Sequence, residues 1–238
     1  MLSIKKEIIE NRLRLFFNKD LYEQKYKEQE VYLKQNKTNL IIYKIYYRQL
    51  CLQLDIALLN EVYSVLPSVY KKILIMKYHD NFTLSKMAIK LNISRTRIMI
   101  MNKKVTECIS NLLFLNITCM FKTKANFFFV SLKLINSMQI RVDNEIKFLL
   151  RNNTNIDISY SYIKGLYTKK NSIIYIKTVI LSELNRLSPI EQEIIRYKVE
   201  NPFNSVSMFS KKYNITEPMI KKVIYKFKEN LLRKISQK

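Results

Sequence analysis

The 238-residue sequence has one glycine, one histidine and no tryptophan. A single glycine excludes a Gly-rich phosphate-binding loop, and no zinc site can be assembled around His79, which lies in a predicted loop. No pair of carboxylates has a supporting catalytic pattern either. We therefore expect a protein that is not an enzyme and that holds neither a metal nor a cofactor.

Cysteines are few and unevenly placed. Cys51, Cys108 and Cys119 form an odd set on apolar stripes, which is typical of reduced thiols buried as small hydrophobes in a cytosolic protein. The N-terminus lacks the apolar segment of a signal peptide, and lysines flank and interrupt the most apolar run, residues 125–134. The sequence thus predicts a cytoplasmic protein with no membrane span.

Positive charge is in large excess. The chain has 42 Lys and Arg against 19 Asp and Glu, a net charge of +23, and both halves are basic. Such an excess favours a polyanionic partner, because each phosphate that is neutralised releases a counterion. The alternative is codon bias, since an AT-rich genome also enriches Lys, Asn, Ile and Tyr.

Residues 66–113 contain the clearest helix boundaries. Pro67 suits a first helical position and begins a helix that should run to about Tyr78. Residues 79–81 break this helix. Thr83 is then a good N-cap for a short second helix with one apolar face.

A tight turn separates the second helix from a third. Asn92 tolerates the left-handed conformation that a C-cap requires, and Ser94 is an N-cap for the third helix. Small Ala88 permits a close approach of the two helices, and Ile93 fills the gap between them. A connection of about three residues is the spacing of a helix-turn-helix. The alternative is a plain helical core segment.

The outer face of the third helix carries candidate DNA contacts. In helix-turn-helix proteins the first residues of this helix reach base edges, and basic residues around them bind phosphates. Arginine also matches guanine in the major groove. The candidates in this motif are Thr83, Ser94, Arg95, Thr96, Arg97, Asn102, Lys103 and Lys104.

A family resemblance rests on these residues. The pattern Leu66-Pro67, Ile73, Tyr78, Thr83 to Ala88, Leu91-Asn92-Ile93-Ser94 and Arg95-Thr96-Arg97-Ile98 resembles region 4 of sigma-70 family factors, the domain that reads the upstream promoter element. The resemblance implies that Arg95, Thr96 and Arg97 contact DNA, with RNA polymerase as a further partner. Met99 and Ile100 occupy the next family contact positions. Because they are apolar, packing on a neighbouring helix is the alternative for them.

The residues before this motif favour helices of a different kind. Met1 to about Lys37 has helical periodicity, and its second half is polar enough to be exposed. Thr38 or Asn39 caps a long apolar helix that should pack against the first helix. Nothing here resembles the sigma region that binds core polymerase, which argues against a complete sigma factor.

Residues 114–186 are expected to be helical. Phe127 to Val130 could alternatively form a short strand, and breaks are expected at 152–155, at Gly165 and at 169–171. Aromatic and basic residues alternate near residue 165, which suits either single-stranded nucleic acid or tyrosines in an ordinary core or surface. These residues are Tyr160, Tyr162, Lys164, Tyr167, Lys169 and Lys170.

The first motif is repeated near the C-terminus. Five apolar intervals match: 66–73 with 187–194, 84–88 with 206–210, 88–93 with 210–215, 93–98 with 215–220, and 98–105 with 220–227. Ser210 replaces Ala88, Asn214 replaces Asn92, and Thr216 replaces Ser94 as the N-cap. One residue is inserted in the loop that holds Pro202. The repeat predicts a second helix-turn-helix.

The outer face of the second motif has a different chemistry. Glu217, Pro218 and Met219 stand where the first motif has Arg95 to Arg97, whereas lysines replace Met99 and Ile100. The first motif is thus better equipped to read bases and the second to bind phosphates. The candidates here are Thr216, Lys221, Lys222 and Lys226. A degenerate copy used for packing or dimerisation is the alternative.

Together these patterns predict an all-α protein with two helix-turn-helix modules joined by a helical middle segment. The segments are 1–65, 66–113, 114–186 and 187–238. The expected function is transcription regulation through double-stranded DNA, with the first motif as the main base reader. The alternatives are a divergent sigma factor acting with core RNA polymerase, and an antirepressor-like protein-interaction module that does not bind DNA. The oligomeric state does not follow from the sequence.

Overall fold

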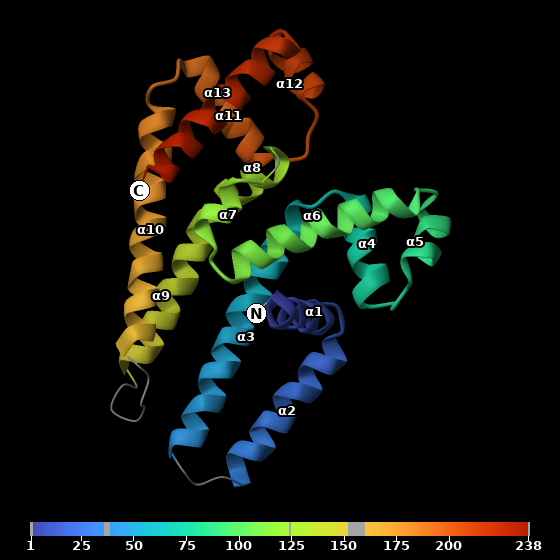
Figure 1. Ribbon diagram of the computed structural model, residues 1–238, viewed down its shortest axis with the longest axis vertical. Coiled ribbons are helices and arrows are strands. Elements are labelled where there is room, and N and C mark those ends of the chain that lie inside the picture. Colours follow the sequence, from blue (N-terminus) through green and yellow to red (C-terminus); the bar gives the residue numbers. More distant parts are fainter. Residues whose placement is uncertain (1, 36–38, 124, 152–159, 238) are drawn as a thin grey trace.

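A computed structural model describes residues 2–35, 39–123, 125–151 and 160–237 (Figure 1). These residues form helices and turns without a strand, so the predicted all-α class is confirmed. The helices are α1 Leu2–Phe17, α2 Lys19–Gln35, α3 Asn39–Val65, α4 Ser68–Tyr78, α5 Leu84–Leu91, α6 Arg95–Leu113, α7 Ile117–Phe121, α8 Ala125–Lys133, α9 Ile135–Arg151, α10 Tyr160–Leu184, α11 Pro189–Glu200, α12 Val206–Tyr213 and α13 Glu217–Ser236. Within the described ranges, none of them is long and apolar enough to cross a membrane.

The N-terminal residues with helical periodicity form two helices, α1 and α2, within the described range 2–35. They separate at Asn18, whose side-chain amide donates to the carbonyls of Arg14 (2.8 Å) and Tyr78 (3.1 Å). No described residue of α2 is buried, as its polar sequence predicts. α3 packs against α1 as expected and forms with α2 a hairpin at the lower end of Figure 1. Thr38, one of the two candidate caps, lies outside the described residues.

The middle segment is helical throughout its described part. Phe127 to Val130 are all buried within α8, so the strand alternative is wrong. Burial of four consecutive residues means that neighbouring helices enclose α8 on every side. Gly165 and residues 169–171 lie inside α10, so the breaks expected there are also wrong. The break expected at 152–155 falls outside the described residues.

α10 continues through these weak points because of its packing. Leu166, Ile173 and Ile176 are buried along one face of the helix. Packing of such a face contributes more to helix stability than intrinsic propensity does, which explains why a single glycine does not end the helix.

Two buried polar networks join α1, α3, α9 and α10. Asp55 forms ion pairs with Arg12 (2.8 Å) and Arg141 (2.6 Å). Glu145 accepts hydrogen bonds from the hydroxyls of Tyr47 and Tyr162. Burial, followed by the hydrogen bond to Glu145, raises the pKa of Tyr47 far above its ordinary value, and the same two causes raise the pKa of Tyr162.

The three cysteines differ in environment, and all are free thiols. Burial raises the pKa of Cys108 to about 12, as expected for a thiol used as a small hydrophobe. Cys51 is half-buried, and burial raises its pKa to about 11. Cys119, on the short helix α7, is exposed, so the expectation of burial was wrong for this residue.

Residues 66–113, here called the N-lobe, comprise α4 to α6, and residues 187–238, the C-lobe, comprise α11 to α13. Part of the N-lobe has a small core of its own, which consists of Ile73, Met76, Met87, Ile98 and Met101. The other buried apolar residues of the N-lobe, among them Leu74, Tyr78 and those of α6 from Val105 onward, belong to the main core. The buried apolar residues of the C-lobe all belong to the main core, which extends through the middle segment to α1 and α3.

Candidate nucleic-acid interface

The N-lobe is built from locally capped helices. The Thr83 hydroxyl accepts a hydrogen bond from the backbone N–H of Lys86, and the Ser94 hydroxyl accepts one from that of Arg97, both at 3.3 Å. These contacts confirm the expected N-caps of α5 and α6. Pro67 occupies the N-cap position of α4 rather than its first helical position, a shift of one residue.

The turn between α5 and α6 is left-handed at Asn92, with φ 52° and ψ 45°. The Ile93 N–H donates to the carbonyl of Ala88 at 3.1 Å, which closes the turn. Ala88 and Ile93 both pack against the small core of the N-lobe. The predicted geometry of this turn is therefore present.

The C-lobe repeats this turn. Asn214 has φ 52° and ψ 41°, and the Ile215 N–H donates to the carbonyl of Ser210 at 3.2 Å. Thr216 has the extended backbone of an N-cap, but its side chain makes no capping hydrogen bond, so that part of the prediction was wrong. Pro218 removes one N–H from the first turn and with it one donor that a cap could satisfy.

The start of α6 forms a basic, exposed end. Arg95, Thr96 and Arg97 are all exposed, and the first turn contains no acid. A helix N-terminus carries a partial positive charge, so this end attracts anions even before its arginines are counted. The charge of Arg97 also acts on Tyr70 and partly offsets the burial that raises the pKa of this phenol.

The three candidates further along α6 do not share one face. Lys103 is exposed, 3.8 Å from the carboxylate of Glu107. Asn102 is half-buried in a hollow against α1, so its predicted outward position was wrong. Lys104 is half-buried on the side facing α7. The helices α1 and α7, which pack on either side of α6, explain both positions.

The candidate lysines of the C-lobe are exposed, but one is paired. Lys221 forms an ion pair with Glu217 at 2.9 Å, one turn away on α13. Lys222 and Lys226 are exposed. Glu217 therefore lowers the positive charge at the start of α13, and the exposed lysines Lys222 and Lys226 lie further along the helix.

The shorter helices supply basic residues that the sequence analysis did not single out. Lys86 and Lys90 of α5 and the residues Lys211 and Lys212 of α12 are exposed. In α5 both lysines lie outside the apolar face that the sequence predicts. The polar positions of this helix were therefore a signal that could have identified them.

Large apolar side chains are also exposed on the N-lobe. Ile89 is 83% exposed, Met99 51% and Ile100 44%. The alternative in which Met99 and Ile100 pack into a neighbouring helix is therefore wrong, although Ile100 borders a hollow that also contains Phe127. Met99 and Ile100 belong to the same outer face of α6 as the basic residues.

The aromatic and basic residues of α10 are partly committed to other contacts. Tyr162 binds Glu145, and Lys170 forms an ion pair with Asp143 at 2.8 Å. Tyr167 and Lys164 are exposed. Ordinary core and surface contacts account for Tyr162 and Lys170, so this strip carries no argument for single-stranded nucleic acid.

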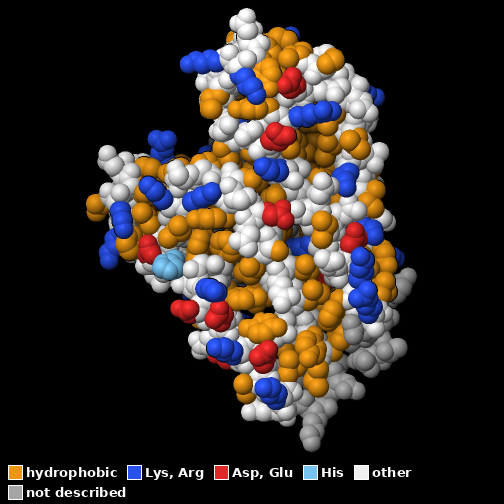
Figure 2. Space-filling model, turned by 180° about the vertical axis from the view of Figure 1, so that it is seen from behind, with side chains coloured by type: hydrophobic (Ala, Val, Ile, Leu, Met, Phe, Trp, Pro, Cys, Tyr) orange, Lys and Arg blue, Asp and Glu red, His pale blue; other side chains and the backbone are white. Residues whose placement is uncertain are grey.

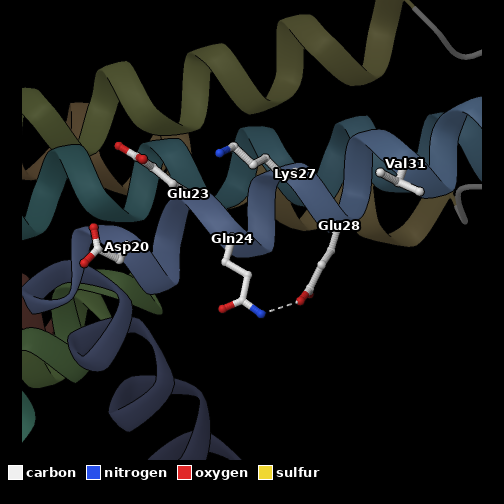
Figure 3. Close-up of a pocket in the computed structure, with 6 residues that line it drawn as sticks. All are labelled: Asp20, Glu23, Gln24, Lys27, Glu28 and Val31. Atoms are coloured by element: carbon white, nitrogen blue, oxygen red, sulfur yellow. Dashed lines mark hydrogen bonds between the residues drawn. The ribbon is translucent and has the colours of Figure 1, made fainter.

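One hollow of the surface lies away from both lobes. Figure 3 shows a hollow lined by residues of α2 alone, in which Gln24 donates to Glu28 at 3.0 Å and the remaining side chains point in different directions. Among the described residues, no three His, Cys, Asp or Glu side chains are placed to hold a metal ion.

An aromatic triangle joins the two lobes to the middle segment. The ring of Tyr70 in α4 lies 5.7 Å from that of Phe127 in α8 and 5.8 Å from that of Phe203, in the loop before α12. Phe127 and Phe203 are 5.4 Å apart. In Figure 1, α6 and α13 both run from the right of the view toward the left, so their N-terminal ends lie on the same side of the molecule.

The opposite view shows the surface of these lobes. In Figure 2 the N-lobe projects at the left, marked by the single histidine, and the C-lobe forms the top, with Lys and Arg side chains on both. No protein-family model, curated protein or solved structure matches the chain.

Proposed function

We propose that the protein is a transcription regulator that binds double-stranded DNA through two helix-turn-helix modules, the N-lobe and the C-lobe. The observation that carries this proposal is the exposure of Arg95, Thr96 and Arg97 at the start of α6, directly after the Asn92 turn. This is the position from which a recognition helix reaches base edges. The proposal is of a cytoplasmic binding protein and not of an enzyme.

The two lobes have different parts in the proposed complex. The N-lobe reads bases, since its arginines extend from an end that has no acid in its first turn. The C-lobe binds phosphates through Lys222 and Lys226. Lys221 contributes less, because its charge is paired with Glu217. Two recognition helices in one chain would suit sites about one helical turn, roughly 34 Å, apart on one face of the duplex.

The test measures DNA binding of three proteins on a pool of genomic fragments at two salt concentrations. These are the wild type, Arg95→Ala/Arg97→Ala and the control Lys25→Ala/Lys34→Ala. The control removes the same charge from exposed positions of α2, at the opposite end of the molecule from the C-lobe. We expect selective enrichment by the wild type and the control, and a loss of at least about 10-fold in affinity for the arginine variant.

A second pair of substitutions tests the C-lobe. Lys222→Ala/Lys226→Ala should weaken binding to all fragments alike and lower the salt dependence, by about one logarithmic unit of slope for each phosphate that the variant no longer neutralises. Equal binding by the wild type, the arginine variant and the α2 control, without enrichment of any fragment, would contradict the proposed base reading.

The exposure of Ile89, Met99 and Ile100 favours a second candidate, a protein-interaction module that does not bind DNA. This candidate predicts no fragment enrichment and a stable complex with a partner protein. The divergent sigma factor is a separate alternative, which would still bind DNA but would act with core RNA polymerase, the partner that the resemblance to sigma region 4 implies. Co-purification with core polymerase that depends on residues 1–65 would support it.

A further inference from the structure

The outer face of α6 holds two apolar side chains in its second turn. Ile98, Met101 and Val105 point into the protein, and helical periodicity places Met99 and Ile100 on the opposite side with Thr96 and Lys103. Both apolar residues are about half exposed. In the proposed DNA complex they would therefore face the same groove as the arginines that precede them.

Their chemistry limits what they can recognise there. Methionine and isoleucine offer no amide for adenine and no guanidinium for guanine. The only apolar group that base pairs present in the major groove is the C5-methyl group of thymine. Contact with this methyl group removes apolar surface of both the side chain and the base from water, which is favourable.

The C-lobe provides an internal comparison. The positions that match Met99 and Ile100 in the repeat are Lys221 and Lys222, so the fold accepts charged residues at these places. At these two positions, apolar residues occur only in the lobe whose helix begins with exposed arginines. Cations on both sides of the apolar pair, Arg97 before it and Lys103 after it, suit a polyanion better than an apolar partner.

We propose that Met99 and Ile100 determine sequence specificity by contacting thymine C5-methyl groups, next to the bases that Arg95 and Arg97 contact. This inference rests on the proposed function, and it names the base chemistry that the N-lobe recognises. It assigns to the N-lobe a target with thymines at the positions under the second turn of α6.

The test uses the selectively enriched duplex and the same duplex with deoxyuridine in place of thymine, one position at a time. This replacement removes only the methyl group and leaves base pairing intact. The wild type should bind about fourfold more weakly for each contacted methyl that is removed. Deoxyuridine at positions outside the N-lobe site should leave the affinity unchanged.

A variant and a matched control assign the effect to residues. Met99→Ala/Ile100→Ala should bind the thymine duplex more weakly than the wild type does, and it should bind the thymine and uracil duplexes equally well. Ile140→Ala truncates another exposed isoleucine, on α9 outside both lobes, and should keep the sensitivity of the wild type. Circular dichroism of each variant checks that the helices are intact.

The outcomes separate this inference from the proposed function. If the enrichment depends on Arg95 and Arg97 but the wild type ignores uridine, the proposed function stands and the methyl contact is wrong. If Met99→Ala/Ile100→Ala keeps the sensitivity to uridine, other residues make the contact and the assignment fails. If no fragment is enriched, both proposals fail.

Discussion

Asn92 and Asn214 adopt the same left-handed conformation at matching places in the two lobes. This conformation costs most L-residues about 1–2 kcal/mol, whereas glycine adopts it freely and asparagine at a lower cost. We expect Asn92→Ala to lower the free energy of unfolding by about 1 kcal/mol and Asn92→Gly to change it by only a few tenths. Urea unfolding of the two variants tests this, and equal losses would mean that the turn does not impose the conformation.

Asp55 also contributes to stability as a single residue, because it pairs with two arginines in a largely buried site. Asp55→Asn should lower the free energy of unfolding by about 3 kcal/mol, since it leaves both cations without their counterion. The control is Glu23→Gln, which breaks the exposed pair with Lys19 and should shift the urea midpoint little. Comparable shifts in the two variants would contradict the assigned role of Asp55.

Single residues were predictable where their structure is local. Thr83, Ser94 and Asn92 act through backbone groups a few positions away, so the sequence alone identified all three. The predicted outward position of Asn102 was wrong because α1, which is distant in sequence, covers its side of α6. The pairing of Lys221 with Glu217 follows from helical spacing and was missed by considering each residue separately.

At the scale of elements, α10 shows that packing outweighs a weak residue. Gly165 lies inside this helix, its φ is not positive, and a Cβ added there would meet no atom within 4 Å. Gly165→Ala should therefore raise the free energy of unfolding by about 0.5–1 kcal/mol, because alanine loses less backbone entropy in a helix. A thermal melt measures the gain, and a lower melting temperature would contradict it.

The helices themselves were predicted better than their ends and interruptions. Caps and apolar periodicity identified α4 to α6, and the repeat transferred those boundaries to α11 to α13. Phe127 to Val130 left helix and strand open, because a short apolar run that is buried on all sides has no period to distinguish them. At the break between α1 and α2, the side chain of Asn18 also donates to the carbonyl of Tyr78, a contact that no local signal shows.

At the scale of the whole molecule, the two lobes differ in how they are supported. Met87 and Phe209 occupy matching positions, yet Met87 belongs to the small core of the N-lobe and Phe209 to the main core. Met87→Ala should speed hydrogen exchange in α5 and in the parts of α4 and α6 that pack on it, and leave α11 to α13 unchanged, because the cavity lies in the smaller core. Phe209→Ala should speed exchange well beyond its own lobe. Uniform acceleration by both variants would contradict separate cores.

Tyr47 links the stability of the whole molecule to alkaline pH. Its folded pKa is raised by burial and by Glu145, so above about pH 10 an unfolded chain releases a proton that the folded chain retains. The stability from this group is complete below about pH 10 and is lost as pH rises further. Tyr47→Phe should be less stable than the wild type at about pH 8, and the difference should shrink toward about pH 11. Urea unfolding across this range measures it, and a constant difference would contradict the linkage.

The rings of Tyr70, Phe127 and Phe203 contact one another where the lobes meet the middle segment, beside the main core that both lobes share. In the proposed complex, a duplex bound by the first lobe would meet the second at an effective concentration set by this contact and not by free diffusion. Two DNA-binding surfaces of low affinity would then act together as one bivalent binding protein. A duplex with its sites on opposite faces would have to bend or to separate the rings. The avidity of such a complex would therefore depend in part on packing inside the protein, away from the recognition helices.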